Sequence, residues 1–275
     1  MADEAVADAL IAVDMGDGAR GYFTTRAPAP AGEGGPYAGF NLALHVGDDP
    51  ARVEAHRRRL ARALGIVPDA AEAAPGAGGR AGIAWMNQVH SARIASARTD
   101  ALPTADALVL DTRTPPAGPG GSGPLPAAAA AVLVADCVPL LLAGADGTAV
   151  AAVHAGRRGF LAGIVPAAVA ALVAGGAESA GIRAAIGPSI CGACYEVGAA
   201  LHAEAAAREP ACASTTRWGT PGIDLAAGIT AQLERAGVRH ILNVHRCTYE
   251  QTELYSYRRD GVTGRQAGIV LLAPA

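Results

Sequence analysis

The sequence contains no lysine, so its 22 basic side chains other than histidine are all arginines. This absence excludes chemistry that needs a lysine amine, such as a Schiff base or the phosphate-binding lysine of a P-loop. Fixed positive charge for the recognition of phosphate or carboxylate must therefore come from arginine or from a metal ion.

The chain also has no excess of positive charge, because 25 acidic residues give it a formal net charge of −3. A protein that follows a nucleic-acid backbone normally carries a basic excess or a strongly basic stripe. We therefore expect a small-molecule partner and no nucleic acid.

Neither an export signal nor a membrane span is visible in the sequence. Asp3, Glu4 and Asp8 occupy the region in which a secretory signal carries positive charge, and no uninterrupted apolar run is long enough to cross a bilayer. An odd number of cysteines favours thiol or metal roles over a disulfide framework. The cysteines are Cys137, Cys191, Cys194, Cys212 and Cys247. We expect a cytoplasmic protein, either a monomer or a small homo-oligomer.

The sequence does contain enough apolar material for a large core, since 51% of its 275 residues are hydrophobic and 17% are charged. Three stretches rich in Gly, Pro and Ala, at 27–36, 70–82 and 115–129, are typical of loops and do not divide the chain. Strands and helices are interspersed between them. We therefore expect one domain over residues 1–275, built as an α/β or α+β sandwich.

Three helices are indicated. Residues 51–65 follow Asp49, which can cap them, and residues 224–237 begin at a capping Asp224. Residues 160–174 are typical of one buried helix, with Pro166 near its start or at a kink.

A β-hairpin is predicted from residues 140–147 and 148–154, with its turn at Asp146 and Gly147. Apolar and β-branched runs indicate further strands at 83–95, 131–137, 241–244, 255–259 and 268–272. The strand at 83–95 would carry Gln88 and His90. Cys137 and His154 would lie at strand ends.

His90, Cys137 and His154 each end or interrupt an apolar segment. Two imidazole nitrogens and one thiolate form a recognised zinc ligand set, which leaves a fourth position open for a water molecule whose pKa the metal lowers. The spacings of 47 and 17 residues match no short zinc signature, however, and a lone buried histidine or cysteine is more often a packed core residue. Asp136 could orient one of the histidines or cap a strand end.

Cys191 and Cys194 form a CxxC pair, which is typical of a structural metal site or a redox dithiol. The sequence has no second CxxC to complete a four-cysteine site, so two buried cysteines in a tight loop are an equal alternative. The signature of zinc nucleobase deaminases is also missing, because the segment from His154 to Gly156 lacks the glutamate.

Arginine pairs at 57–58, 157–158 and 258–259, together with Arg265, could bind an oxyanion through their guanidinium forks. Pairs of this kind are also common on solvated faces, so the pattern alone leaves their role open.

Eight short motifs follow one another along the chain: 39–50 (GFNLALHVGDDP), 88–90 (QVH), 105–107 (ADA), 135–139 (ADCVP), 152–156 (AVHAG), 186–188 (IGP), 194–197 (CYEV) and 256–261 (SYRRDG). In this order they closely resemble the laccase-domain family, also described as the multicopper polyphenol oxidase family or the YfiH-type purine nucleoside phosphorylase family. The resemblance spans the chain from about Arg20 to Leu272.

The resemblance implies a YfiH-like α/β sandwich with one zinc ion bound by the residues at 90, 137 and 154. It implies phosphorolysis of adenosine, inosine, guanosine and S-methyl-5′-thioadenosine to base and ribose 1-phosphate, and deamination of adenosine to inosine. Purine nucleoside and phosphate would be the ligands. By position, the residues that resemble polar, anion-binding or ribose-binding site residues are Asn41, Gln88, Arg57, Arg258 and Arg265.

Two positions depart from the family pattern. Arg157 stands where the family usually has a tryptophan, which alters the pocket wall beside His154. Ala193 stands where the family has the first cysteine of a Cys-Cys pair, which argues against a catalytic role for Cys191 or Cys194 by analogy.

Two other functions stay open at this level. Two histidines and a cysteine are also the equatorial ligands of blue copper, so a copper-dependent polyphenol oxidase is one alternative. Multicopper oxidases need clustered histidines, whereas this chain has seven histidines and no His-X-His pair. The other alternative is a non-catalytic metal protein that senses a nucleoside.

Overall fold

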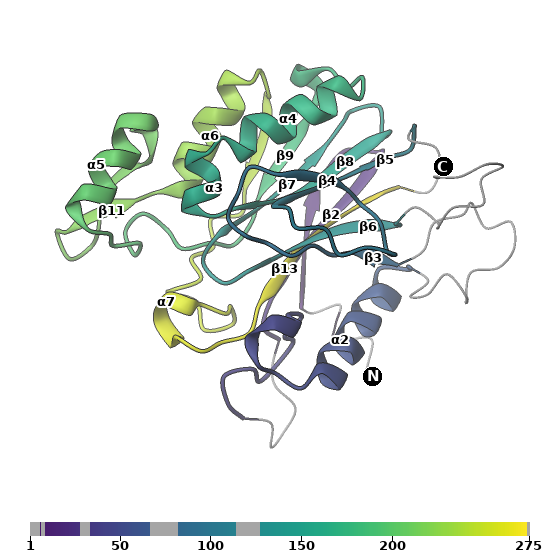
Figure 1. The fold of residues 1–275 in the computed structure, drawn as a ribbon, viewed down its shortest axis with the longest axis horizontal. Coiled ribbons are helices and arrows are strands. Elements are labelled where there is room, and N and C mark those ends of the chain that lie inside the picture. The colour runs from purple at the N-terminus through teal and green to yellow at the C-terminus, as the bar shows by residue number, and fades with distance from the viewer. Residues whose placement is uncertain (1–5, 7–8, 28–33, 67–81, 114–126, 274–275) are drawn as a thin grey trace, which may run out of the picture.

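Two β-sheets lie face to face at the centre of the molecule (Figure 1). They are seen in a computed structural model that describes residues 6, 9–27, 34–66, 82–113 and 127–273. The five-stranded sheet has the order β1 (Leu10–Asp14), β2 (Ala19–Thr24), β13 (Gln266–Leu272), β6 (Ala129–Val134), β3 (Ile83–Ala84). The six-stranded sheet has the order β12 (His240–Asn243), β9 (Arg183–Ile186), β7 (Val138–Ala143), β8 (Ala149–Ala155), β5 (Ala107–Asp111), β4 (Ile94–Ser96). A separate pair joins β10 (Ala213–Thr215) and β11 (Pro221–Ile223).

Helices cover the outer face of each sheet (Figure 1). The six-stranded sheet packs against α4 (Ile164–Ala174) and α6 (Leu225–Arg235), and the five-stranded sheet packs against α2 (Pro50–Ala63). The remaining helical segments are α3 (Arg157–Leu161), α5 (Ala199–Arg208), α7 (Tyr257–Asp260) and the 3-10 turns η1 (Leu44–Val46), η4 (Ser179–Gly181) and η5 (Pro210–Cys212). In the described ranges, no helix has the length and apolar character needed to cross a membrane. The mixed α/β sandwich expected from the sequence is confirmed.

Alternate residues of the central strands face different layers. Along β8, Val150 and Ala152 pack between the two sheets, whereas Ala151 and Val153 face the covering helices. Both faces of the strand are thus buried, which explains why its sequence is an almost unbroken apolar run. The same alternation turns His154, near the end of β8, toward the space between the sheets.

The two capped helices are confirmed. The Asp49 carboxylate accepts a 2.9 Å hydrogen bond from the N–H of Ala51 at the start of α2, and Asp224 accepts one of 2.9 Å from Ala227 at the start of α6. Such caps satisfy N–H groups that have no partner within the helix.

The single helix expected over 160–174 is wrong, because this segment belongs to two helices, α3 and α4. Gly163 separates them with a φ of +89°, a conformation that cannot continue a right-handed helix. Pro166 lies in the first turn of α4, where proline is tolerated.

The hairpin is confirmed as β7 and β8, which pair antiparallel with Leu141 opposite Ala152. Gly147 supplies a φ of +65° in the turn between them. The strands expected at 241–244 and 268–272 correspond to β12 and β13. The loop stretches expected at 27–36, 70–82 and 115–129 fall mostly outside the described residues.

The strand expected at 83–95 is largely wrong, since only its two ends belong to strands, β3 and β4. Between them the N–H groups of residues 89–91 bind the side chain of Asp106 instead of a neighbouring strand. Gln88 and His90 therefore lie on an irregular segment.

Two other strand expectations need correction. The strand expected at 131–137 ends at Val134, so Cys137 lies in the connection between β6 and β7. Residues 255–259 do not form a strand, because Ser256 caps α7 by accepting a 3.2 Å hydrogen bond from the N–H of Arg259. A residue that caps a helix cannot at the same time extend a β-ladder.

Candidate metal centre and ligand cavity

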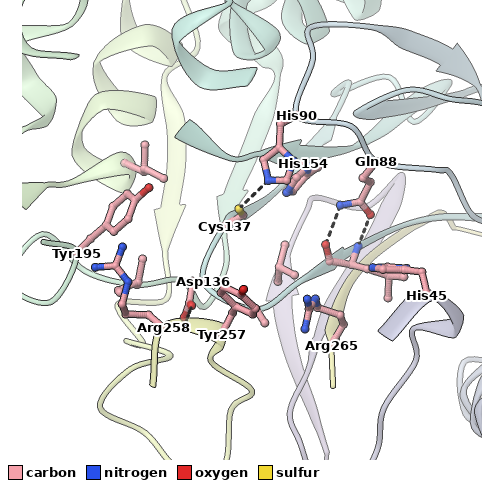
Figure 2. Close-up of a pocket in the computed structure, with 15 residues that line it drawn as sticks. His45, Gln88, His90, Asp136, Cys137, His154, Tyr195, Tyr257, Arg258 and Arg265 are labelled. Carbon is pink, nitrogen blue, oxygen red and sulfur yellow. Dashed lines mark hydrogen bonds between the residues drawn. The ribbon is translucent and has the colours of Figure 1, made fainter. Parts of the chain in front are cut away.

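The fold brings His90, Cys137 and His154 together, although they are far apart in the sequence (Figure 2). One ligand atom from each lies within 4.8 Å of the others. The Sγ atom of Cys137 is 3.6 Å from Nε2 of His90, and the two imidazole rings meet nearly at right angles with their centroids 4.7 Å apart. We call this group the His-Cys-His cluster.

Asp106 fixes the backbone on which His90 lies. Its carboxylate accepts hydrogen bonds from the N–H groups of Val89, His90 and Ser91, at 3.2, 2.9 and 2.6 Å. His90 has a φ of +60°, which is uncommon for a residue with a side chain and is maintained here by this carboxylate.

The same carboxylate orients His154. Nδ1 of His154 lies 2.8 Å from Oδ1 of Asp106, and both side chains are buried. A carboxylate on one ring nitrogen fixes the tautomer and leaves the other nitrogen, Nε2, to face a metal. The sequence suggested Asp136 for this role, but Asp136 instead accepts hydrogen bonds from Thr248, Ser256 and Arg258.

The environment favours ionised Cys137. Burial raises the pKa of the thiol, but the charge of His154 and hydrogen bonds from both histidines outweigh burial and lower it to about 6. For His154, burial lowers the pKa, while the Cys137 thiolate and Asp106 raise it above its ordinary value. A thiolate is the form of cysteine that binds metal ions.

Because Gly156 has no side chain, His90 and Cys137 can occupy the space beside its Cα atom. A Cβ atom at this position would lie 2.5 Å from Cδ2 of His90 and 3.0 Å from Sγ of Cys137. Atoms do not approach so closely without displacement, so a residue with a side chain would push His90 or Cys137 aside.

The separation of Cys137 and His90 in the cluster matches that of two zinc ligands. Tetrahedral zinc, with bonds of about 2.3 Å to sulfur and about 2.05 Å to nitrogen, separates those ligand atoms by about 3.6 Å. The distance between Cys137 and His90 is 3.6 Å. Copper also accepts two histidines and a cysteine, so the donor set fits both metals.

The His-Cys-His cluster lies in the wall of a cavity of about 370 Å³. This volume lies within the range of small-molecule sites in proteins. The other polar and aromatic side chains around it are His45, Gln88, Asp136, Tyr195, Tyr257, Arg258 and Arg265 (Figure 2).

Two of the three arginines that the sequence singled out as anion or ribose binders line the cavity. Arg258 donates a 2.7 Å hydrogen bond to the carbonyl of Glu196, and its guanidinium lies 5.1 Å from the ring centroid of Tyr195. Arg265 donates to the carbonyls of Thr263 and Gly264. Both guanidinium groups are held in place by backbone oxygens and keep other donor atoms for a ligand.

Asn41 and Arg57 do not line the cavity. Asn41 is buried, and its Oδ1 accepts a 2.9 Å hydrogen bond from the N–H of Arg265, so it acts on the position of that arginine. Arg57 donates to the carbonyl of Leu42 and lies over the ring of Trp85, 4.1 Å from its centroid. Both contacts are consistent with structural roles.

Gln88 does line the cavity, but its amide is already paired. Nε2 donates to the carbonyl of Leu133 at 2.8 Å, and Oε1 accepts from the N–H of Leu133 at 2.9 Å.

Sequence reasoning assigned no role to Asp106, Tyr195, Tyr257 or His45. All four lie in motifs that carried the family resemblance, so the motifs were the available signal. Nothing in the spacing of His45, Tyr195 and Tyr257 shows that they meet at one cavity, or that Asp106 lies behind its histidines.

Comparison with known proteins gives relatives over almost the whole chain. The family model described as multi-copper polyphenol oxidoreductase laccase matches residues 20–273. A purine nucleoside phosphorylase of Streptomyces coelicolor is 45% identical over 243 residues, which are 86% of this chain and 89% of the relative. Another purine nucleoside phosphorylase, from Corynebacterium glutamicum, is 41% identical over 258 residues, covering 92% of this chain and 94% of the relative.

Solved structures show the same fold. A Neisseria meningitidis protein superposes with a TM-score of 0.76 at 28% identity, covering 97% of this chain and 100% of its own. YlmD from Geobacillus stearothermophilus gives a TM-score of 0.76 at 28% identity, covering 95% and 94% of the two chains. With the family model matched from residue 20 to residue 273, the chain belongs to the multi-copper polyphenol oxidoreductase laccase family, as its ordered motifs indicated.

Proposed function

We propose that the chain is a zinc-dependent purine nucleoside phosphorylase. Its substrates would be adenosine, inosine, guanosine and S-methyl-5′-thioadenosine, and it would also deaminate adenosine to inosine. The observation that carries the proposal is the His-Cys-His cluster in the wall of a cavity of about 370 Å³ that also presents Arg258 and Arg265. The relatives named purine nucleoside phosphorylase support the reaction class.

His90, Cys137 and His154 would hold the zinc ion. When bound, zinc supplies a Lewis acid that polarises a substrate nitrogen or oxygen and lowers the pKa of a water molecule. Asp106 would keep His154 in the tautomer that coordinates through Nε2.

The two cavity arginines would bind phosphate. In phosphorolysis a phosphate oxygen bonds to C1′ of the ribose while the bond from C1′ to the purine nitrogen breaks, and the base leaves with the bonding electrons. Guanidinium groups bind the phosphate oxygens and hold the nucleophile in line with C1′. The chain positions both arginines through their backbones, since the N–H of Arg258 binds Asp136 and that of Arg265 binds Asn41.

Tyr195 and Tyr257 would hold the base and sugar. Both line the cavity, and aromatic faces stack well on purine rings. Phosphorolysis acts at C1′ and deamination acts at C6 of the purine, where the amino group leaves as ammonia and an oxygen from water replaces it. The two reactions therefore need different ligand orientations relative to the His-Cys-His cluster.

The test is to measure zinc in the purified protein and to separate the products of inosine or adenosine by chromatography, with and without phosphate. We expect phosphate-dependent release of hypoxanthine from inosine and of adenine from adenosine. Cys137→Ala should lose both the zinc and the activity. Absence of any purine product from the zinc-loaded protein would overturn the proposal, and full phosphorolysis by zinc-free Cys137→Ala would overturn the role of the cluster.

The family description and the donor set also support a second candidate, a copper-dependent polyphenol oxidase. In the described part of the chain, the His-Cys-His cluster is the one group of three or more potential metal ligands that contains histidine. Multicopper oxidases, in contrast, need several histidine-bound copper ions. Reconstitution with copper and assay with a phenol distinguishes the two candidates. Oxidation of the phenol by the copper protein, together with no turnover of nucleosides by the zinc protein, would favour the oxidase.

A further inference from the structure

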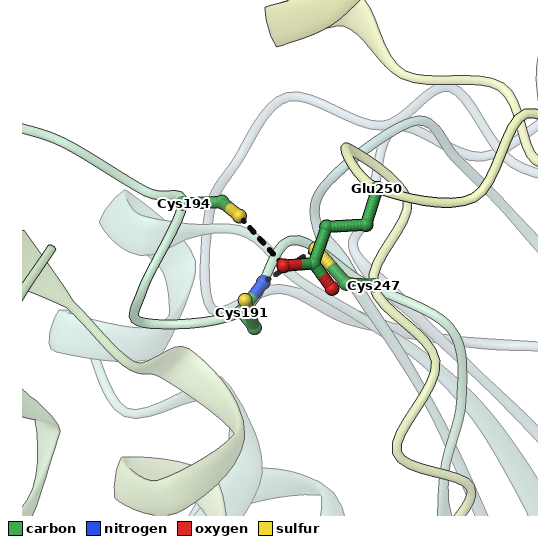
Figure 3. Close-up of side chains that lie close together, drawn as sticks. All are labelled: Cys191, Cys194, Cys247 and Glu250. Atoms are coloured by element: carbon green, nitrogen blue, oxygen red, sulfur yellow. Dashed lines mark hydrogen bonds between the residues drawn. The ribbon is translucent and has the colours of Figure 1, made fainter. Parts of the chain in front are cut away.

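A second group of metal-binding side chains lies away from the cavity and takes no part in the proposed function. Cys191, Cys194, Cys247 and Glu250 each place one ligand atom within 4.8 Å of the others (Figure 3). The first two follow β9 and the last two follow β12, so two segments far apart in the sequence meet here. We call this group the Cys3Glu cluster.

Both halves of the Cys3Glu cluster have the same local form, with two donors three residues apart on a turn. In each half the carbonyl of the first cysteine accepts a hydrogen bond from the residue four positions later. The N–H of Tyr195 donates to Cys191 at 2.9 Å, and the N–H of Gln251 donates to Cys247 at 3.0 Å. The sequence contains no second CxxC. In the structure, the pair that meets the CxxC is a Cys-x-x-Glu, formed by Cys247 and Glu250.

Backbone hydrogen bonds join the two halves. The N–H of Ser189 donates to the carbonyl of Arg246, and the N–H of Thr248 donates to the carbonyl of Ser189, both at 3.1 Å. These bonds fix the separation of the two turns, so the four donors are brought together before any ion binds.

The surroundings of the Cys3Glu cluster suit an anionic ligand set. The guanidinium of Arg217 contacts both the Glu250 carboxylate and Sγ of Cys194, which offsets part of the negative charge. The N–H of Cys191 points to Sγ of Cys247 at 3.5 Å.

We propose that Cys191, Cys194, Cys247 and Glu250 bind a structural zinc ion. Three thiolates and one carboxylate complete a closed tetrahedral set, in contrast to the three donors of the His-Cys-His cluster. Thiolate sulfur selects zinc over magnesium or calcium. Tetrahedral zinc places sulfur ligands about 3.8 Å apart, given bonds of about 2.3 Å, so the cluster needs only a small contraction to hold the ion.

The second zinc would hold the two loops that form part of the cavity wall. Tyr195 follows Cys194 directly and lines the cavity. Thr248 follows Cys247, and its hydroxyl donates a 2.7 Å hydrogen bond to Asp136, which lies beside Cys137. The ion would thus support the cavity without contacting a ligand in it.

Zinc content measured by mass spectrometry of the purified variants tests this proposal. We expect two zinc ions per chain in the unaltered protein, one in Cys137→Ala, one in Cys191→Ser and none in the double variant. Cys212→Ala is the matched control, because Cys212 is buried outside both clusters and should leave two zinc ions. A chain with one zinc that Cys137→Ala removes and Cys191→Ser retains would overturn this inference but not the proposed function. The reverse pattern would support this inference and overturn the zinc site of the proposed function.

Two further measurements distinguish thiolate-bound zinc from a disulfide or from zinc bound elsewhere on the chain. Cobalt bound to Cys137→Ala should show the strong charge-transfer absorption of several thiolate ligands, which a site without cysteine sulfur cannot produce. Titration of the denatured, unreduced protein should find all five thiols, and three thiols would reveal a disulfide and overturn the proposal.

If Cys191→Ser fails to fold, Glu250→Gln serves instead, since it keeps the three sulfurs and should release zinc to weaker chelators than the unaltered protein does.

Discussion

At the scale of single residues, one carboxylate sets the geometry of the His-Cys-His cluster. Asp106 binds three consecutive N–H groups around His90 and the Nδ1 atom of His154. Asp106→Asn preserves the size of the side chain but places an amide N–H where an acceptor is needed. Because such outer partners typically contribute 10–100-fold to metal affinity, we expect zinc binding to weaken by about that factor.

Competition with a chromophoric chelator measures this change in affinity. The matched control is Asp224→Asn, which makes the same chemical change at the cap of α6, where asparagine caps as well as aspartate. Equal zinc affinity in Asp106→Asn and in the unaltered protein would show that the cluster does not depend on its carboxylate partner.

Gly156 offers a second test at the same scale. It precedes α3 with an ordinary φ of −77°, so its role is to leave space and not to adopt an unusual conformation. In Gly156→Ala the added methyl would lie 2.5 Å from His90, and we expect it to displace that ligand and weaken zinc binding by about tenfold or more.

Gly198→Ala is a close control for Gly156→Ala. Gly198 also precedes a helix, α5, with a φ of −65°, and an added Cβ there meets no atom within 4 Å. Zinc affinity should therefore fall in the first variant and stay unchanged in the second. A fall in both would point to a general effect of alanine before a helix.

At the scale of elements, the side chain of Gln88 replaces a missing strand. β3 pairs with β6 only at Ile83 and Ala84, and farther along β6 the amide of Gln88 forms both hydrogen bonds with the backbone of Leu133. Gln88→Ala would leave these groups without partners. An unsatisfied buried backbone group destabilises a protein by about 1–3 kcal/mol, and we expect a loss of that size in the free energy of unfolding.

Urea unfolding measures this loss, with Asn87→Ala as the control. Asn87 is the neighbouring amide residue and is exposed, so its removal should change stability by less than about 0.5 kcal/mol. If Gln88→Ala keeps its stability but raises the KM for nucleosides, Gln88 contacts the substrate and the structural interpretation is wrong.

Local chemistry explains which elements the sequence could predict. The helices at α2 and α6 were predictable because Asp49 and Asp224 mark their starts, and the hairpin was predictable from its Asp-Gly turn. The strand expected over 83–95 was not found because a distant carboxylate, Asp106, binds its N–H groups. Competition from tertiary contacts of this kind leaves no trace in local periodicity.

At the scale of the whole molecule, the candidate site is assembled from segments along most of the chain. The cavity takes residues from η1, the connection from β6 to β7, the loop after β9 and α7. The three donors, 47 and 17 residues apart, were connected by the resemblance and not by their spacing. The second cluster was not predictable, because nothing in a Cys-x-x-Glu reveals that it meets a CxxC more than 50 residues away.

A site assembled in this way should couple ligand binding to global stability. The cavity exists only in the folded chain, so phosphate that binds there raises the free energy of unfolding by RT ln(1 + [L]/Kd), about 2.7 kcal/mol at a hundredfold excess over Kd. We expect the Tm to rise with phosphate concentration.

Phosphate also stabilises proteins in general through its exclusion from their surfaces, so the informative quantity is the difference in Tm between variants at equal phosphate concentration. Arg265→Gln, which removes a cavity cation, should lose most of the concentration dependence. Arg98→Gln, which alters a partly exposed arginine outside the cavity that is paired with Asp100, should retain it. Equal dependence in both variants would show that phosphate binds away from Arg265.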